Sequence, residues 1–219
     1  MIKAVFFDFD GTLADTAPDL GFAINQVLQN HKHPTLPYET IRPHVSGGSP
    51  ALIKLGFNID ADHPSFAQLK QEFLQSYEKA MLAKSKLFAG IRESLNFLNQ
   101  KQVVWGIITN KPDYLTQPIV AHFNLINQAQ VIISGDTYPL KKPDPYPLIQ
   151  ACKICNVAVE ESIYVGDDER DIIAAKAANM QSVCANWGYQ ANKDSVDWQA
   201  DYYLQESIDL KPFLSQLLN

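Results

Sequence analysis

Six short runs of consecutive apolar residues recur along most of this chain, separated by stretches with helical periodicity. A strand buried on both faces forms a continuous apolar run, whereas a strand with one exposed face alternates apolar and polar residues. The strand–helix alternation therefore predicts an α/β fold with a Rossmann-like, doubly wound parallel sheet. The predicted strands are residues 3–7, 103–108, 130–133, 162–166, 182–185 and 201–204.

One region departs from this alternation. From residue 15 to about residue 87 we find no convincing strand, while residues 20–31 and 66–81 carry apolar side chains at helical spacing. The pattern predicts an all-helical cap inserted after the first strand, beside the sheet edge where ligands bind in open α/β folds. We expect residues 16–86 to form this cap, and residues 1–15 and 87–219 to form the catalytic core.

Polar and charged residues follow the predicted strands directly. Asp8 ends the first apolar run and Asp10 comes two positions later, so two carboxylates stand where they would repel each other. Because the carboxyl ends of parallel strands meet at one edge, the groups after the other strands should converge on this pair. These groups are Thr109, Asn110, Lys111, Lys141, Lys142, Asp167, Asp168 and Asp171.

This set of residue types favours phosphate chemistry with a hard metal ion. Grouped carboxylates suit Mg²⁺, which prefers oxygen ligands, and a lysine, a hydroxyl and helix N-terminal amides suit phosphate oxygens. One of the first two acids can then attack phosphorus while the other moves a proton. The pattern predicts a Mg²⁺-dependent phosphomonoester hydrolase acting on a small phosphorylated substrate.

Four segments carry a family resemblance, namely "DFDGT" (8–12), "TNKP" (109–112), "KKPDP" (141–145) and "GDDERD" (166–171). Their order and spacing resemble the motifs of the haloacid dehalogenase-like hydrolase superfamily, in its phosphatase branch with a helical cap. The resemblance implies an aspartyl-phosphate mechanism with Asp8 as nucleophile and Asp10 as acid and base. It further implies that the Asp8 carboxylate, the Asp10 backbone carbonyl and Asp167 bind Mg²⁺, that Thr109 and Asn110 hold the phosphoryl group, that Lys142 steadies its charge, and that Asp171 orients the cluster from behind. Asp168 and Lys141 receive no role.

Shorter segments resemble one branch more closely. "VSGG" (45–48), "SKLFAG" (85–90) and "KPDPYPLIQACK" (142–153) look like those of N-acetylmuramic acid 6-phosphate phosphatases, with phosphoglycolate phosphatases next. In such relatives a loop between cap helices reads the leaving group, which implies substrate contacts by Arg42, Ser46, Gly47 and Gly48. A plain helix–helix turn is the other interpretation of that loop.

Three alternative functions stay open on the sequence. A sugar phosphomutase is disfavoured because Leu20 stands where mutases of this cap type carry histidine. A phosphonate-cleaving enzyme would need a cap lysine such as Lys54. A non-catalytic binding protein is disfavoured by the intact carboxylates.

Composition excludes several partners. The net charge of −6 gives no basic surface for nucleic acid, and no apolar run approaches the roughly 18 residues that span a membrane. Three cysteines favour a reducing cytoplasm, and we expect Cys152 and Cys155 to pack in the core rather than to do redox chemistry. We expect a cytoplasmic monomer or weak homodimer.

Overall fold

A six-stranded parallel sheet forms the centre of one part of the chain. The computed structural model describes residues 1–189 and 195–218. The sheet order is β5-β4-β1-β6-β7-β8, with every neighbouring pair parallel. The strands are β1 (Ala4–Phe7), β4 (Val104–Ile108), β5 (Val131–Ile133), β6 (Ser162–Gly166), β7 (Gln181–Ala185) and β8 (Tyr202–Leu204). The predicted doubly wound α/β fold is confirmed, and each strand begins and ends within one residue of its predicted bounds.

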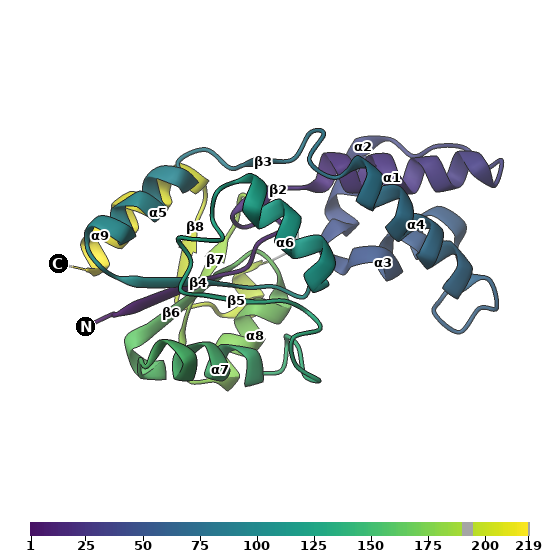
Figure 1. Ribbon diagram of the computed structural model, residues 1–219. Helices are drawn as coiled ribbons and strands as arrows, with labels where there is room; N and C mark the ends of the chain where they lie inside the picture. Colours follow the sequence, from purple (N-terminus) through teal and green to yellow (C-terminus); the bar gives the residue numbers. More distant parts are fainter. Residues whose placement is uncertain (190–194, 219) are drawn as a thin grey trace. The chain divides into compact units, whose positions relative to one another are not determined.

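Helices cover both faces of this sheet. Figure 1 shows α5 and α9 on one face, and α7 and α8 on the other. Order reverses around β1: the chain builds β4 and β5 on one side of it, then crosses to β6, β7 and β8 on the other. Such a reversal is where open α/β sheets bind ligands. The helices of this part are α5 (Ile91–Gln100), α6 (Asp113–His122), α7 (Tyr146–Cys155), α8 (Glu169–Ala177) and α9 (Leu210–Leu217), with 3₁₀ turns at Val159–Glu161, Ser195–Trp198 and Ser207–Asp209.

The core beneath α7 explains the two closely spaced cysteines. Cys152 is buried in an apolar cluster with Phe6, Leu148 and Tyr164, and Cys155 packs against the same cluster. Both thiols are free, and burial raises the pKa of each above its ordinary value. A raised pKa disfavours the reactive thiolate, so the expected packing role is confirmed for this pair.

The chain divides into two compact units. The first consists of Met1–Ala14 together with Leu87–Asn219, and the second is Asp15–Lys86. The second unit is helical, with α1 packed against α4 through residues such as Ile24, Leu28, Phe73 and Tyr77, all buried. Its elements are α1 (Ala17–Asn30), α2 (Tyr38–Ile41), a 3₁₀ helix (Arg42–Gly47), α3 (Gly48–Phe57) and α4 (Phe66–Ala80). Two-residue strands, β2 (Ala14–Asp15) and β3 (Lys86–Leu87), pair with each other where the chain enters and leaves this unit.

Two local expectations for this unit were wrong. Residues 41–50 were expected to form a loop, but they form the last residue of α2, the 3₁₀ helix and the first turn of α3. Pro43 near the start of the 3₁₀ helix has a fixed φ that suits a helical first turn, and this turn carries no hydrophobic periodicity that the sequence could reveal. The short strands β2 and β3 were also missed, because two-residue strands leave no pattern.

A buried carboxylate links the two ends of the helical unit by hydrogen bonds. Asp19, in the first turn of α1, is 1% exposed. It accepts hydrogen bonds from the Lys84 N–H (3.0 Å), the Ser85 N–H (2.9 Å) and the Ser85 hydroxyl (2.7 Å). These bonds tie the first helix of the unit to the last residues before β3.

Of the helices within the described residues, none combines the length and the apolar character needed to cross a membrane.

Candidate active site

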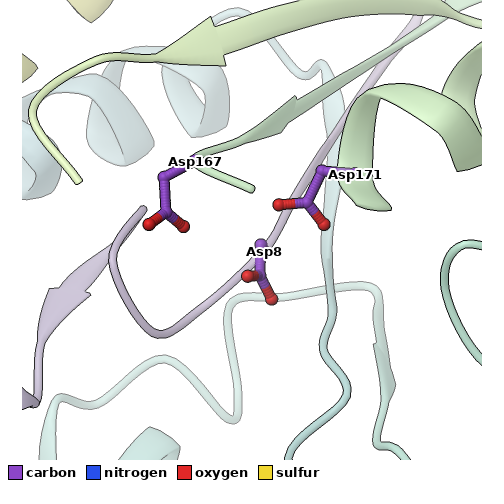
Figure 2. A group of neighbouring side chains, drawn as sticks. All are labelled: Asp8, Asp167 and Asp171. Carbon is purple, nitrogen blue, oxygen red and sulfur yellow. The ribbon is translucent and has the colours of Figure 1, made fainter. Parts of the chain in front are cut away.

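Three carboxylates meet at the carboxyl edge of the sheet. Asp8 follows β1, Asp167 follows β6, and Asp171 lies in the first turn of α8. Figure 2 shows their side chains turned toward one another, and one oxygen from each lies within 4.8 Å of the others. Their exposed fractions are 9%, 2% and 1%. Three acids this close and this buried require positive charge nearby.

Lys142 supplies part of that charge. Its Nζ lies 2.9 Å from Asp8 Oδ1 and 2.7 Å from Asp171 Oδ1. It also donates a hydrogen bond to the Tyr164 hydroxyl, which in turn donates to the Ile108 carbonyl, both at 2.7 Å. Burial alone would lower the pKa of Lys142, but Asp171 and Asp8 outweigh burial and raise it. Lys142 therefore stays charged. Its partners are Asp8 after β1, Tyr164 in β6 and Asp171 in α8.

One lysine does not balance three carboxylates. Burial, reinforced by Asp8 and Asp171, raises the pKa of Asp167 well above its ordinary value. Burial also raises the pKa of Asp171 to about 7, a rise that Lys142 opposes and Asp8 reinforces. Asp8 Oδ1 is buried, and apart from its ion-pair contact with Lys142 no donor in the described residues meets it at hydrogen-bonding geometry. The cluster is short of positive charge.

Asp167 is fixed in place on several sides. It accepts hydrogen bonds from the Thr12 hydroxyl (3.2 Å) and the Tyr189 N–H (2.9 Å). Gly11 and Gly188 pack directly against it, and a Cβ on either would overlap the Asp167 side chain. Gly11 also has φ of +87°, a backbone conformation that glycine adopts at little cost. The glycine of the "DFDGT" segment is thus required both by its turn and by the carboxylate beside it.

Asp10 lies in a separate ion pair. Its two oxygens lie 3.1 Å and 3.3 Å from Nζ of Lys111, a lysine whose side chain is 6% exposed. The sequence pattern missed this partner, because Lys111 stands in the "TNKP" segment without a periodic or spacing signal of its own. The repulsion expected between Asp8 and Asp10 is relieved here by two different lysines.

Thr109 and Asn110 follow β4 at the same edge. Thr109 is 4% exposed, and its hydroxyl accepts a hydrogen bond from the Lys111 N–H at 3.2 Å. The Asn110 side chain donates to the Lys142 carbonyl at 2.8 Å, so it braces the segment that carries this lysine. Both residues lie at the expected edge, and their contact with a phosphoryl group stays a prediction.

The two acids of the "GDDERD" segment that were hardest to assign have distinct surroundings. Asp168 caps α8 by accepting from the Arg170 N–H (3.0 Å), and it pairs with the Arg170 guanidinium (2.7 Å). Asp171 accepts from the Asp168 N–H at 3.1 Å and contacts Lys142 through its other oxygen. Asp168 therefore serves the helix start, whereas Asp171 serves both the helix start and the cluster. Lys141 is exposed.

The remaining expected contacts belong to the helical unit. Arg42 and Ser46 lie in its 3₁₀ helix with Gly47, and Gly48 begins α3. Arg42 forms a hydrogen bond with the Tyr38 hydroxyl. Lys54 is exposed and lies 2.6 Å from Asp60, an ordinary surface ion pair rather than the desolvated setting that makes a lysine nucleophilic.

The cluster of Asp8, Asp167 and Asp171 fits a divalent cation. Three converging carboxylates share Lys142 as their cation, and burial raises the pKa values of Asp167 and Asp171, so the cluster has room for further positive charge. Oxygen donors of this kind are the ligands of hard divalent cations.

Comparison with known proteins places this fold and site in a family. The family model for haloacid dehalogenase-like hydrolases matches residues 5–185. A phosphoglycolate phosphatase of Xanthomonas campestris pv. campestris is 42% identical, over 95% of this chain and 94% of its own. An N-acetylmuramic acid 6-phosphate phosphatase of Pseudomonas putida is 34% identical, over 99% and 98%.

A solved structure, described as a predicted phosphoglycolate phosphatase from Haemophilus somnus 129PT, superimposes with a TM-score of 0.87. It covers 97% of this chain and 98% of its own at 24% identity, and so supports the fold. The chain belongs to the haloacid dehalogenase-like hydrolase family. Within that family it is an enzyme of the phosphatase class.

Proposed function

We propose that this phosphatase hydrolyses the phosphomonoester of a small metabolite through an aspartyl-phosphate on Asp8, with Mg²⁺ as cofactor. The observation that carries the proposal is that the cluster of Asp8, Asp167 and Asp171 has more negative than positive charge. Asp8 presents a buried oxygen that forms an ion pair with Lys142 but meets no donor at hydrogen-bonding geometry in the described residues, and two further carboxylates lie beside it. A nucleophile needs a free lone pair held in place, and a phosphoryl group needs nearby positive charge.

The chain's own residues can carry both chemical steps. In the first, an Asp8 oxygen forms a bond to phosphorus while the bond to the leaving oxygen breaks, and Asp10 gives its proton to that oxygen. In the second, Asp10 takes a proton from water as the water oxygen bonds to phosphorus, which releases inorganic phosphate and the Asp8 carboxylate. Lys142 neutralises charge on the phosphoryl oxygens, and Thr109 and Asn110 orient them.

The proposed metal site uses Asp8, the Asp10 backbone carbonyl and Asp167, with Asp171 positioned behind them. When bound, Mg²⁺ supplies positive charge that lets carboxylates and a phosphate occupy one small volume. Hydrogen bonds from Thr12 and the Tyr189 N–H, with Gly11 packed beside it, fix the Asp167 side chain in place and support this role.

Two substrates follow from the relatives' names, phosphoglycolate and N-acetylmuramic acid 6-phosphate. We propose that the helical unit decides between them and that the sugar phosphate is preferred. Gly47 and Gly48 keep the 42–48 segment small, which favours a bulky polar sugar, and Arg42 suits the carboxylate that both substrates carry.

Comparing kcat/KM for the two substrates tests the preference, and a higher value for phosphoglycolate would reject it while leaving the phosphatase class intact. Enlarging Gly47 is a poor probe, because a Cβ there would overlap Ala51, and Gly48 has φ of +64°. Ser46→Leu is the sharper variant, with exposed Glu39→Leu as control. It should reduce kcat/KM for the sugar phosphate far more than for p-nitrophenyl phosphate, and equal losses would contradict a role in selectivity.

We further propose a cytoplasmic monomer or weak homodimer. None of Cys152, Cys155 and Cys184 forms a disulfide in the described residues, which supports a reducing compartment. Size-exclusion chromatography with light scattering tests the assembly.

A further inference from the structure

Lys111 is a strongly buried cation at the site edge, and neither the sequence nor the proposed function gives it a role. Lys111 is 9% exposed, and its Nζ donates to both carboxylate oxygens of Asp10. A lysine is rarely buried without a partner, because removing an ammonium from water is costly. The pair therefore restrains the Asp10 carboxylate as well as satisfying the lysine.

The backbone of Lys111 is itself held at three points. Its N–H donates to the Thr109 hydroxyl at 3.2 Å. Its carbonyl accepts from the Gly135 N–H at 2.8 Å and from the Thr116 hydroxyl at 3.2 Å. A side chain anchored on such a segment presents its ammonium from a fixed origin.

The two lysines of the site divide the acids between them. Lys142 contacts Asp8 and Asp171, whereas Lys111 contacts Asp10. The carboxylate assigned to proton transfer thus pairs with a different lysine from the carboxylate assigned to attack.

We propose that Lys111 is a positioning residue for Asp10: it fixes the carboxyl group in the orientation from which a proton passes to the leaving oxygen. This inference rests on the proposed function and deepens it. The ammonium keeps its proton throughout, and Asp10 alone gives and takes the proton in the two steps. Loss of Lys111 should therefore matter most where the leaving group needs that proton.

Leaving groups of different basicity give the test. The alkoxide of an alkyl phosphate such as phosphoglycolate must be protonated as it departs, whereas p-nitrophenolate departs without help. In Lys111→Met we expect kcat/KM for phosphoglycolate to fall by about 10–10²-fold, and that for p-nitrophenyl phosphate by no more than about threefold. Lys111→Arg should recover most of the loss, because a guanidinium can contact both carboxylate oxygens. Lys153→Met, an exposed lysine on α7, is the matched control and should leave both values unchanged.

A double-mutant comparison separates positioning from phosphate binding. In the Asp10→Asn background, Lys111→Met should cost less than about twofold further, because the group it positions is already disabled. Equal losses for both substrates, with weaker inhibition by inorganic phosphate, would show that Lys111 binds the phosphoryl group and would overturn the proposal. A full additional loss in the Asp10→Asn background would overturn it too.

Folding is read separately, by thermal melting of each variant. If Lys111→Met alone does not fold because the partly buried Asp10 loses this ion pair, Lys111→Arg and the Asp10→Asn/Lys111→Met pair still give the comparison. Failure of the proposed function would look different: wild-type enzyme would turn over without using Asp8, whatever the Lys111 variants do.

Discussion

Buried carboxylates occur in both units of this protein, and their surroundings are opposite. Asp19, in the helical unit, accepts hydrogen bonds from three donors, the Lys84 N–H, the Ser85 N–H and the Ser85 hydroxyl, and no other acid takes part in these bonds. At the sheet edge, one oxygen from each of Asp8, Asp167 and Asp171 lies within 4.8 Å of the others. Lys142 forms ion pairs with Asp8 and Asp171, and the buried Asp8 Oδ1 meets no donor at hydrogen-bonding geometry in the described residues.

The difference teaches which acid stabilises the fold and which serves chemistry. A carboxylate whose lone pairs are met by fixed donors contributes to folding, and removing it strands those donors. Repulsion within a cluster that is short of positive charge does not stabilise the fold, and a cation that binds there relieves it. Asp→Asn exchanges in the two places should therefore have opposite signatures.

The largest effect is expected at Asp8. Asp8→Asn should abolish turnover, because an amide is a poor nucleophile and a poor metal ligand, yet it should not lower the melting temperature of metal-free protein, since it removes a repelling charge. Steady-state assays with p-nitrophenyl phosphate and thermal melts check both halves. More than a few per cent of wild-type activity would exclude the covalent mechanism.

Chelation should be equally complete but reversible. EDTA should silence the enzyme and Mg²⁺ should restore it, whereas Ca²⁺ should inhibit. Ca²⁺ accepts larger and looser coordination, which would let Asp8 bind through both oxygens and lose its free lone pair. Full activity after exhaustive chelation would contradict the metal assignment.

At Asp10 we expect a large but incomplete loss. Asp10→Asn removes leaving-group protonation and water activation, steps typically worth about 10²–10⁴-fold. The loss in kcat/KM should be larger for alkyl phosphates than for p-nitrophenyl phosphate. Equal losses would place the proton donor elsewhere.

Asp19→Asn should reverse the pattern. The substituted amide turns hydrogens toward the Lys84 and Ser85 donors, so we expect a loss of about 2–3 kcal/mol in the free energy of unfolding. Urea denaturation measures it, with exposed Asp62→Asn as the control. A melting temperature equal to that of wild type would show that the three hydrogen bonds do not stabilise the helical unit.

The smallest predicted effect is on metal affinity. Burial raises the pKa of Asp171 to about 7 and that of Asp167 well above its ordinary value, so these groups take up protons as the pH falls. Mg²⁺ needs ionised oxygens, and its affinity should therefore fall several-fold between about pH 8 and about pH 6. Titration calorimetry at both pH values checks this, and an affinity that rises on acidification would contradict it.

The sheet was predictable from the sequence because strands buried on both faces leave continuous apolar runs, as residues 162–166 illustrate. The Lys111–Asp10 pair was not predictable, because the residues are 101 positions apart and periodicity says nothing about which polar side chains meet. The segment 41–50 was predicted to be a loop because glycine and proline are common in loops, yet proline also suits a first helical turn. Asp19 escaped notice because its donors are mostly backbone N–H groups, which the sequence does not distinguish.

The central claim is that the undersatisfied acid, Asp8, becomes phosphorylated during turnover. Rapid quenching of the working enzyme followed by borohydride reduction converts an aspartyl-phosphate to homoserine, and peptide mass spectrometry locates it. We predict homoserine at residue 8 in wild-type enzyme and none at residue 19. Rapid turnover with no homoserine, or with homoserine at another aspartate, would contradict the account.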